Sequence, residues 1–215
     1  MATYINFKDP NSPELDKLLA DLPTCPGTCI FIDIVGSTNI KYRTEFKSWA
    51  RMLNNTFNFI TFLNDFPNHV VKGIGDELML YIPDEDLRKK KTINNHYHLL
   101  EEIYATLHNI KNFPGSTMFL PCKVALHYCT DVYNITYFAN YDDYYGRDID
   151  LSARLMTKSR IHRIVFSEKF YNLVVNDARQ LGLDTQQSCL THVSEKFIED
   201  FKGVPFATEF RIIDV

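Results

Sequence analysis

The sequence predicts an α+β protein with a mixed, mainly antiparallel sheet and flanking helices. Segments with helical periodicity alternate with β-branched apolar runs along the 215 residues, and several of these runs are paired across short turns. Alternation alone would favour a parallel sheet, whereas paired runs make antiparallel neighbours. A chain of this length holds one generous domain.

Residues 1–26 contain several prolines and are expected to form an N-terminal extension with one short helix at 13–20. The domain then spans residues 27–215 and opens with the apolar run 28–35, which lies between two glycines as a buried strand does. A long helix is predicted at 39–64, because apolar residues recur there every three or four positions. Its expected core face consists of Phe46, Trp49, Leu53, Phe57 and Ile60.

Two short apolar runs at 69–72 and 78–82 flank a Gly-rich reversal and predict a hairpin. The remaining predicted elements are a helix at 92–111, a strand pair at 123–128 and 132–138, a polar and aromatic loop at 141–147, a helix at 148–158, a strand at 163–166, a helix at 168–179 and strands near 188–194 and 207–213.

Composition excludes several classes of protein. Hydrophobic residues make up 45% and charged residues 23%, as in ordinary globular proteins. A net charge of -4 argues against a nucleic-acid coat protein. Neither a secretory signal nor an apolar stretch long enough for a membrane helix is found. The five cysteines show no metal-binding spacing, so we expect free buried thiols and a cytoplasmic protein.

Two aspartates stand where a metal site would need them. Asp33 lies in the buried strand, where a carboxylate is costly unless it is paired, and Asp76 follows the glycines of the hairpin. Asp33 could instead cap the next helix, and Asp76 could be a turn residue. Together they offer the hard oxygen ligands that Mg²⁺ or Mn²⁺ requires. Glu77 is expected to be solvated or structural.

A third segment pairs Asp150 with Arg154 on one face of a helix. An ordinary helix ion pair explains this spacing. The alternative is that Arg154 binds a phosphate in a transition state, for which a planar guanidinium is well suited.

These segments, FIDIVGST, KGIGD and DYYGRDIDLSAR, resemble in order and spacing the motifs of class III adenylate and guanylate cyclases, with Phe201-Lys202-Gly203 as a weaker fourth match. The resemblance implies a ferredoxin-like βαββαβ core over residues 27–215 and a reaction that turns a nucleoside triphosphate into a 3′,5′-cyclic monophosphate. It also implies two divalent metal ions (Mn²⁺ or Mg²⁺) and a head-to-tail homodimer with composite sites.

The family pattern assigns roles to single residues. Asp33, Asp76 and the backbone carbonyl of Ile34 would bind the metals, and Lys72 and Asp143 would read the base. Arg154 would steady the α-phosphate and Lys202 would contact the triphosphate. Asp150 stands where the family has Asn, which orients the ribose; a carboxylate cannot donate the hydrogen bond that an amide can.

The base is predicted from two opposed features. Lys72 with Asp143 is the pair associated with adenine, which favours ATP. The motifs are also similar to the stand-alone bacterial Pycsar pyrimidine cyclases, whose cUMP or cCMP activates a separate effector during phage infection. Bulky side chains would narrow a pyrimidine pocket, and Trp49, Tyr144 and Tyr145 are candidates, although core packing also explains Trp49. We expect UTP before CTP.

Two other classes of protein are the alternatives to a cyclase: a catalytically silent nucleotide sensor and a GGDEF-type enzyme. Both metal aspartates and Arg154 are present, which argues against the sensor, and no GG[DE]EF string occurs, which argues against the second enzyme.

Overall fold

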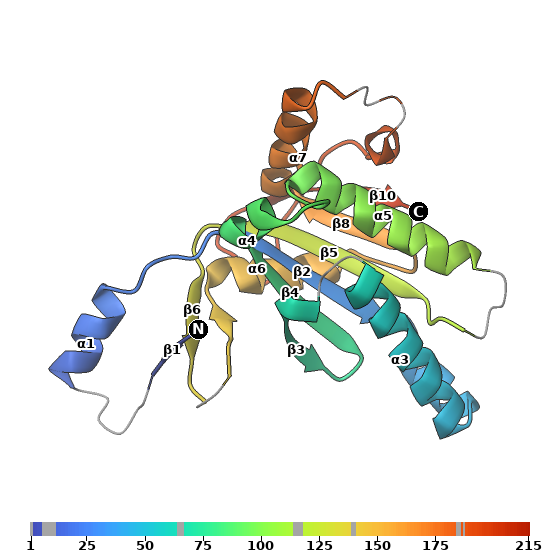
Figure 1. The fold of residues 1–215 in the computed structure, drawn as a ribbon, viewed down its shortest axis with the longest axis horizontal. Coiled ribbons are helices and arrows are strands. Elements are labelled where there is room, and N and C mark those ends of the chain that lie inside the picture. Colours follow the sequence, from blue (N-terminus) through green and yellow to red (C-terminus); the bar gives the residue numbers. More distant parts are fainter. Residues whose placement is uncertain are drawn as a thin grey trace.

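The computed structural model describes residues 2–5, 12–63, 67–113, 118–138, 141–183, 186 and 188–215. Its main sheet has seven strands (Figure 1). In spatial order they are β3 (Val70–Ile74), β4 (Glu77–Pro83), β2 (Gly27–Ile34), β5 (Cys122–Cys129), β8 (Arg163–Ser167), β10 (Thr208–Asp214) and β9 (Phe197–Glu199).

The first four strands of that order form the core predicted from the resemblance. Along the chain they run β2, β3, β4, β5, with helices after β2 and after β4, and β2 lies between β4 and β5. All neighbours within this core are antiparallel, whereas β5 and β8 are parallel. The βαββαβ order and the mixed, mainly antiparallel sheet are therefore confirmed.

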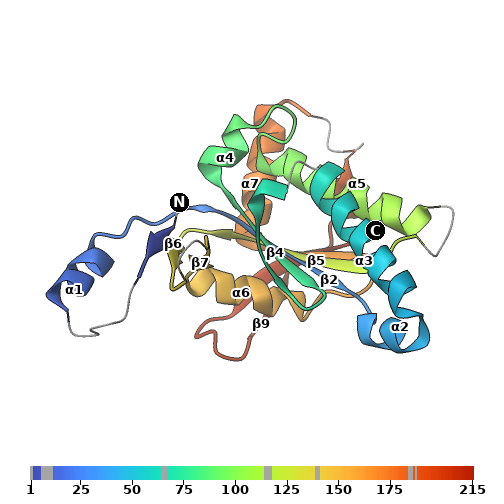
Figure 2. The same cartoon turned by 60° about the horizontal axis from the view of Figure 1, so that its bottom comes forward.

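Helices cover both faces of the sheet, whereas the first helix projects from the body of the molecule (Figure 1). The helices are α1 (Pro13–Ala20), α2 (Ser37–Arg43), α3 (Phe46–Leu63), α4 (Asp84–Lys89), α5 (His96–Asn112), α6 (Arg147–Met156) and α7 (Glu168–Gln180). Figure 2 shows α3, α5 and α7 on one face and α6 on the other. Side chains alternate along each strand, so β2 sends Ile30 and Ile32 toward the first group and Cys29 and Phe31 toward α6.

The prediction of one long helix at 39–64 is wrong in one respect, because the segment forms two helices, α2 and α3. Thr44 has an extended conformation (φ −122°, ψ 143°) and ends α2, and the carbonyl of Glu45 then accepts the first hydrogen bond of a new helix from the N–H of Trp49. A β-branched residue tolerates this extended conformation well. The expected core face starts later than predicted, because Phe46 is 68% exposed whereas Ile60 is buried.

The strand at 132–138 also departs from its predicted pairing with the strand before it. β6 (Tyr133–Thr136) lies in a separate three-stranded sheet, parallel to β1 (Thr3–Tyr4) and antiparallel to β7 (Tyr144–Tyr145). Asp148 accepts the backbone N–H groups of Thr130 and Asp131, which fixes the chain reversal after β5 and directs β6 away. The loop predicted at 141–147 thus contains a short strand.

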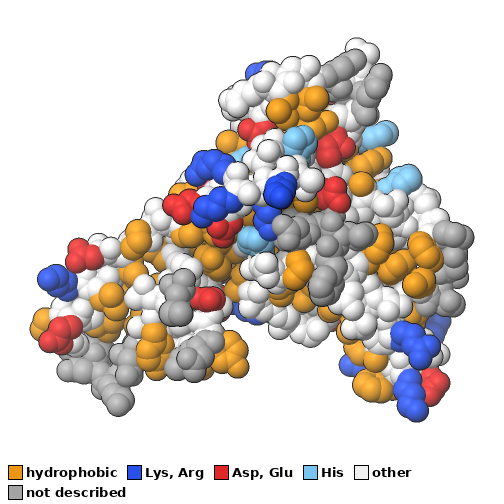
Figure 3. Space-filling view, viewed as in Figure 1, with side chains coloured by type: hydrophobic (Ala, Val, Ile, Leu, Met, Phe, Trp, Pro, Cys, Tyr) orange, Lys and Arg blue, Asp and Glu red, His pale blue; other side chains and the backbone are white. Residues whose placement is uncertain are grey.

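One predicted strand is a helical turn instead, and one further short helix follows the hairpin. The strand predicted near 188–194 is a 3₁₀ helix, Cys189–His192, which begins where Ser188 accepts the N–H of Leu190. The charged stretch after β4 forms α4, with acidic residues in its first turn and basic residues in its last, as the helix dipole favours. Figure 3 shows these charges gathered over α4.

The N-terminal helix is confirmed at 13–20, and it has no buried residue. In Figure 1 it projects from the body of the molecule. β1 and Ile5 nevertheless pair with β6, and the main sheet begins at Gly27, so the division between residues 26 and 27 stays a prediction. Among the described residues, no helix has the length and apolar character that crossing a membrane requires.

One stability prediction follows from the close approach of two loops at the start of α6. A Cβ at Gly146 would lie 2.0 Å from the carbonyl oxygen of Asp131, a contact with rigid backbone. Gly146→Ala is expected to lower the free energy of unfolding by about 1–3 kcal/mol, measured by urea denaturation. Gly73→Ala is the control, since its Cβ would meet nothing closer than 3.8 Å. Equal stability of the two variants would contradict this packing.

Candidate active site

The two aspartates of the predicted metal site lie at the same end of the main sheet. Asp33 is the penultimate residue of β2, and the backbone N–H of the next residue, Ile34, donates to the backbone carbonyl of Asp76 at 3.3 Å. Asp76 lies in the turn between β3 and β4, where Gly75 has a φ of 68°. That left-handed conformation suits glycine, which has no Cβ. A backbone hydrogen bond therefore joins the two segments that carry these aspartates.

Asp33 does not cap the helix that follows it, so that interpretation is wrong. Gly36 is the N-cap of α2, and among the described residues no side chain caps this helix. The carboxylate of Asp33 is bound instead by Lys123, whose Nζ lies 2.9 Å from Oδ2. The two side chains are 20% and 23% exposed, so the pair is largely removed from water.

Strand register brings a third carboxylate to this cluster. Asp33 of β2 lies directly opposite Glu77 of β4 and Lys123 of β5, and opposite residues in antiparallel strands share a face. Burial raises the pKa of Glu77, and the charges of Asp33 and Asp76 raise it further against the opposing effect of Lys123. Glu77 is thus half-buried within the cluster.

Sequence reasoning assigned Glu77 no role and passed over Lys123 entirely. One signal was present: a lysine within the mainly apolar run 122–129, where a charged side chain is as unusual as Asp33 is in its own strand.

This cluster fits hard divalent cations. Asp33 and Asp76 supply carboxylate oxygens from adjacent segments, which is the ligand chemistry of Mg²⁺ and Mn²⁺. The ammonium of Lys123 already contacts Asp33, so positive charge is favoured at this position. A metal ion there would compete with Lys123 for the same carboxylate.

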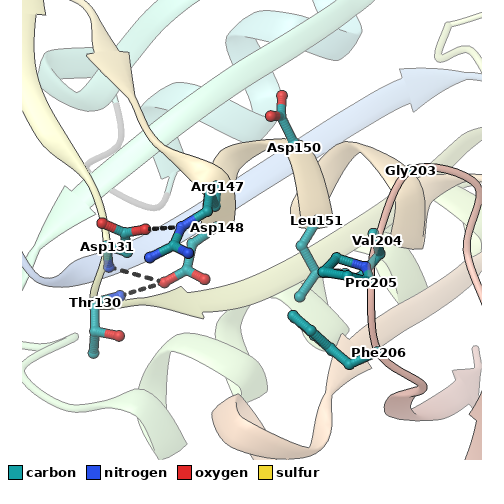
Figure 4. A pocket seen from close by; sticks show the side chains of 10 residues that line it. All are labelled: Thr130, Asp131, Arg147, Asp148, Asp150, Leu151, Gly203, Val204, Pro205 and Phe206. Carbon is teal, nitrogen blue, oxygen red and sulfur yellow. Dashed lines mark hydrogen bonds and ion pairs between the residues drawn. The ribbon is translucent and has the colours of Figure 1, made fainter.

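The helix α6 presents its predicted functional residues to solvent. Asp150 and Arg154 are both exposed, and neither side chain makes a hydrogen bond or ion pair within the described part of the chain. The ordinary ion pair between them is therefore not formed. Figure 4 shows the carboxylate of Asp150 pointing away from that of Asp148, which is bound to the turn after β5.

A cavity of about 380 Å³ adjoins this helix. Its lining includes Asp148, Asp150 and Leu151 from α6 and the segment 203–206 of the loop before β10 (Figure 4). Lys202 is exposed at the start of that loop, next to Gly203, whose φ is 86°. Lys202, which is predicted to contact phosphate, is thus next in sequence to the lining of a cavity that Asp150 of α6 also lines.

The two predicted base-reading residues bind each other. Nζ of Lys72 lies 2.8 and 2.9 Å from the two carboxylate oxygens of Asp143. The backbone N–H of Tyr144 fixes one of these oxygens at 2.8 Å, and the ring of Tyr145 lies 5.3 Å from the ammonium. The hairpin and the loop before α6 therefore meet at one point, although they are far apart in sequence.

The three bulky candidates have different surroundings. Tyr145 lies beside Lys72, whereas Tyr144 stacks on Tyr81 at 4.2 Å and so packs against the core beneath α6. Trp49 lies in the first turn of α3, where it packs against Lys41 and Phe46. Of the three, Tyr145 is the one that this structure brings to the Lys72–Asp143 pair.

The chain has the fold of class III cyclase catalytic domains. A guanylyl cyclase, Cya2, superposes with a TM-score of 0.66 at 13% identity, covering 89% of this chain and 93% of that one. The adenylyl cyclase CyaB from P. aeruginosa gives 0.61 at 16% identity, with 91% and 99% covered. A dimeric guanylyl cyclase domain of the RhoGC fusion protein from Blastocladiella emersonii gives 0.62 at 16% identity, with 88% and 96% covered.

At the level of sequence the chain matches no protein-family model and no curated protein. Of these comparisons, the one with solved structures is the one that identifies the shared fold.

The Lys123–Asp33 pair generates a stability prediction. Lys123→Met leaves the buried carboxylates without their cation, so the free energy of unfolding is expected to fall by about 1–3 kcal/mol in metal-free buffer. Saturating Mn²⁺ is expected to reduce this loss, because the ion supplies the missing positive charge. Denaturant titrations with and without Mn²⁺ measure both effects.

The matched control is Lys196→Met, which removes a lysine from the more exposed pair with Glu209 at 3.0 Å. It is expected to cost less than about 1 kcal/mol, with no dependence on Mn²⁺. A loss in Lys123→Met that Mn²⁺ leaves unchanged would show that no cation binds beside Asp33.

Proposed function

We propose that this protein is a class III nucleotidyl cyclase, which converts a nucleoside triphosphate into a 3′,5′-cyclic nucleoside monophosphate and pyrophosphate. The observation that carries the proposal is the meeting of Asp33 and Asp76 at one end of a ferredoxin-like sheet. The shared fold supports it, as do the three motifs that hold these aspartates and Arg154.

Asp33, Asp76 and the backbone carbonyl of Ile34 would hold two divalent ions, Mn²⁺ or Mg²⁺. When bound, the ions would lower the pKa of the ribose 3′-hydroxyl and neutralise the leaving polyphosphate. The 3′-oxygen then forms its bond to the α-phosphorus in line as the bond to the β-phosphate bridging oxygen breaks, and the hydroxyl proton goes to solvent. Because the attack is intramolecular, positioning contributes more than a strong protein base.

The remaining residues bind and orient the substrate. Arg154 would hold the α-phosphate as charge develops, Lys202 would bind the triphosphate and Asp150 would contact the ribose. Lys123 would give up its contact with Asp33 to a bound ion, and its ammonium would then be available to the phosphates beside the cluster.

Two copies of the chain would build each site. Arg154 is exposed and, within the described part of the chain, makes no hydrogen bond or ion pair to Asp33 or Asp76. A partner's aspartates could therefore meet Arg154 across a homodimer interface, as the resemblance implies, and such a head-to-tail pair closes with two equivalent sites.

For the base we propose a pyrimidine, UTP before CTP, and a role in Pycsar-type antiphage signalling through a separate effector. The resemblance of the motifs supports this, and so does Tyr145, whose ring stands beside Lys72 and would fill space that a purine needs. The cytoplasm is the proposed location, supported by five free cysteines. ATP is the second candidate, because the Lys72–Asp143 pair is the one associated with adenine.

The composite site can be tested by mixing two inactive variants. Asp33→Ala and Arg154→Ala are each expected to lose at least about 100-fold in activity. An equimolar mixture forms heterodimers with one intact site, so about a quarter of wild-type activity is expected to return. Product formation is measured by chromatography, and native mass spectrometry, which separates the variants by mass, checks that heterodimers form. A mixture that forms heterodimers but stays inactive would contradict shared sites.

The substrate is tested by incubating the purified protein with each of the four NTPs and Mn²⁺ and identifying the product by mass spectrometry. Cyclic UMP is expected to form fastest. Cyclic AMP as the sole product would overturn the pyrimidine proposal and leave the cyclase intact. Binding without any cyclic product, in a protein that retains Asp33 and Arg154, would instead favour the silent nucleotide sensor.

A further inference from the structure

A second cluster of metal-ligating side chains lies under the first turn of α6. His127 and Cys129 are two residues apart on β5, so both face α6, and Asp148 reaches them from that helix. One ligand atom from each of the three residues lies within 4.8 Å of the others. This cluster shares no residue with the proposed catalytic set.

The histidine in this cluster is buried and incompletely satisfied. His127 is 3% exposed, its Nδ1 has no hydrogen-bond partner in the described structure, and its Nε2 faces a carboxylate without a well-formed hydrogen bond. Such a group is costly to bury unless another partner satisfies it. Its Nε2 lies 3.4 Å from Oδ1 of Asp148. Two ligands bound about 2.1 Å from one tetrahedral ion are themselves about 3.4 Å apart.

The carboxylate is held in place for this task. Oδ2 of Asp148 accepts the backbone N–H groups of Thr130 at 2.6 Å and Asp131 at 3.0 Å (Figure 4), and Lys169 lies 3.6 Å from the same oxygen. Oδ1 therefore remains for His127 and an ion. Hydrogen bonds to the outer oxygen of a ligating carboxylate are typical of metal sites.

The thiol makes weak hydrogen bonds. Sγ of Cys129 donates to the carbonyl of His127 at 3.6 Å, and it lies 4.0 Å from Oγ of Ser152, at the limit for sulfur. A small rotation of the Cys129 side chain toward an ion would therefore lose only weak hydrogen bonds. Asp148 also lines the 380 Å³ cavity beside α6, so one member of the cluster borders open space.

We infer that His127 Nε2, Cys129 Sγ and Asp148 Oδ1 form a second metal site, which binds a transition metal ion of the zinc type. Imidazole and thiolate select such ions over Mg²⁺, which prefers oxygen ligands alone. Binding deprotonates Cys129 and releases one proton to solvent. The bound ion ties β5 to the first turn of α6.

This tie has a consequence that rests on the proposed function. Asp150 and Arg154 follow Asp148 on the same short helix, so an ion that fixes the first turn also fixes where these side chains project. The site would then regulate or stabilise the cyclase through the position of α6. Metal binding itself does not depend on that function.

Cobalt is the probe for this site, because a cobalt–thiolate bond gives a charge-transfer absorption in the near ultraviolet. Full-length protein freed of metal with a chelator is titrated with Co²⁺ and, separately, with Zn²⁺ followed by mass spectrometric metal counting. We expect one equivalent of tightly bound ion and a thiolate band. Excess Mg²⁺ is expected to leave the band in place.

Variants identify the ligands. Cys129→Ser is expected to abolish the thiolate band, and His127→Gln to weaken Zn²⁺ binding at least about tenfold. Cys189→Ala, which removes another buried cysteine outside the cluster, is expected to keep both. Circular dichroism melting confirms that each variant is folded before its binding is compared.

Asp33→Asn with Asp76→Asn separates this site from the proposed catalytic one: the double variant is expected to lose activity and retain the thiolate band. Wild-type protein that binds no Zn²⁺ or Co²⁺, or a band that survives Cys129→Ser, would overturn the inference.

Discussion

The register of β2 between its two neighbours is the constraint on which the rest of this structure depends. Asp33 lies opposite Glu77 on one side and Lys123 on the other. A slip of one residue in either pairing would turn Asp33 to the other face and bury it among the aliphatic residues under α3 and α5. The apolar residues of β2 prevent this slip, because its two faces fill two different cores. Packing energy spent on Ile30, Ile32 and Phe31 therefore fixes the position of a carboxylate.

The apolar core between α6 and the sheet, which includes Phe31, Leu151 and Leu155, fixes the orientation of α6, just as strand register fixes that of Asp33. Leu151 and Leu155 are buried against the sheet, so Asp150 and Arg154, which lie between and beside them on the helix, must face outward. Asp148 sets the rotation and depth of the first turn through the two amides of the β5–β6 reversal. One face of a ten-residue helix thus anchors it while the other presents the charges.

Local sequence patterns predicted most of the elements, and the errors share a cause. The buried strand with Asp33, the hairpin with Asp76 and the helix with Arg154 are encoded by neighbouring residues and were predicted correctly. The pairing of β6 was wrong because Asp148, distant in sequence, redirects the chain after β5. The salt bridge of Lys123 and the burial of His127 depend on which strands lie side by side, and no local periodicity carries that information. The break at Thr44 is local, but propensity alone is too weak to locate it.

The closed Lys72–Asp143 pair bears on how a base could be chosen. Both oxygens of Asp143 accept from Lys72, and the carboxylate is only 17% exposed, so a base that binds here would have to replace these hydrogen bonds. Lys72 requires a neighbouring acceptor and Asp143 a neighbouring donor. Adenine and cytosine offer an amino donor beside a ring acceptor, and guanine and uracil offer a carbonyl acceptor beside a ring N–H. Each of the four bases can therefore satisfy this pair in some orientation. In the proposed site the pair would therefore fix the position of the edge of the base, and the space beside the pair, which Tyr145 borders, would decide between a one-ring and a two-ring base.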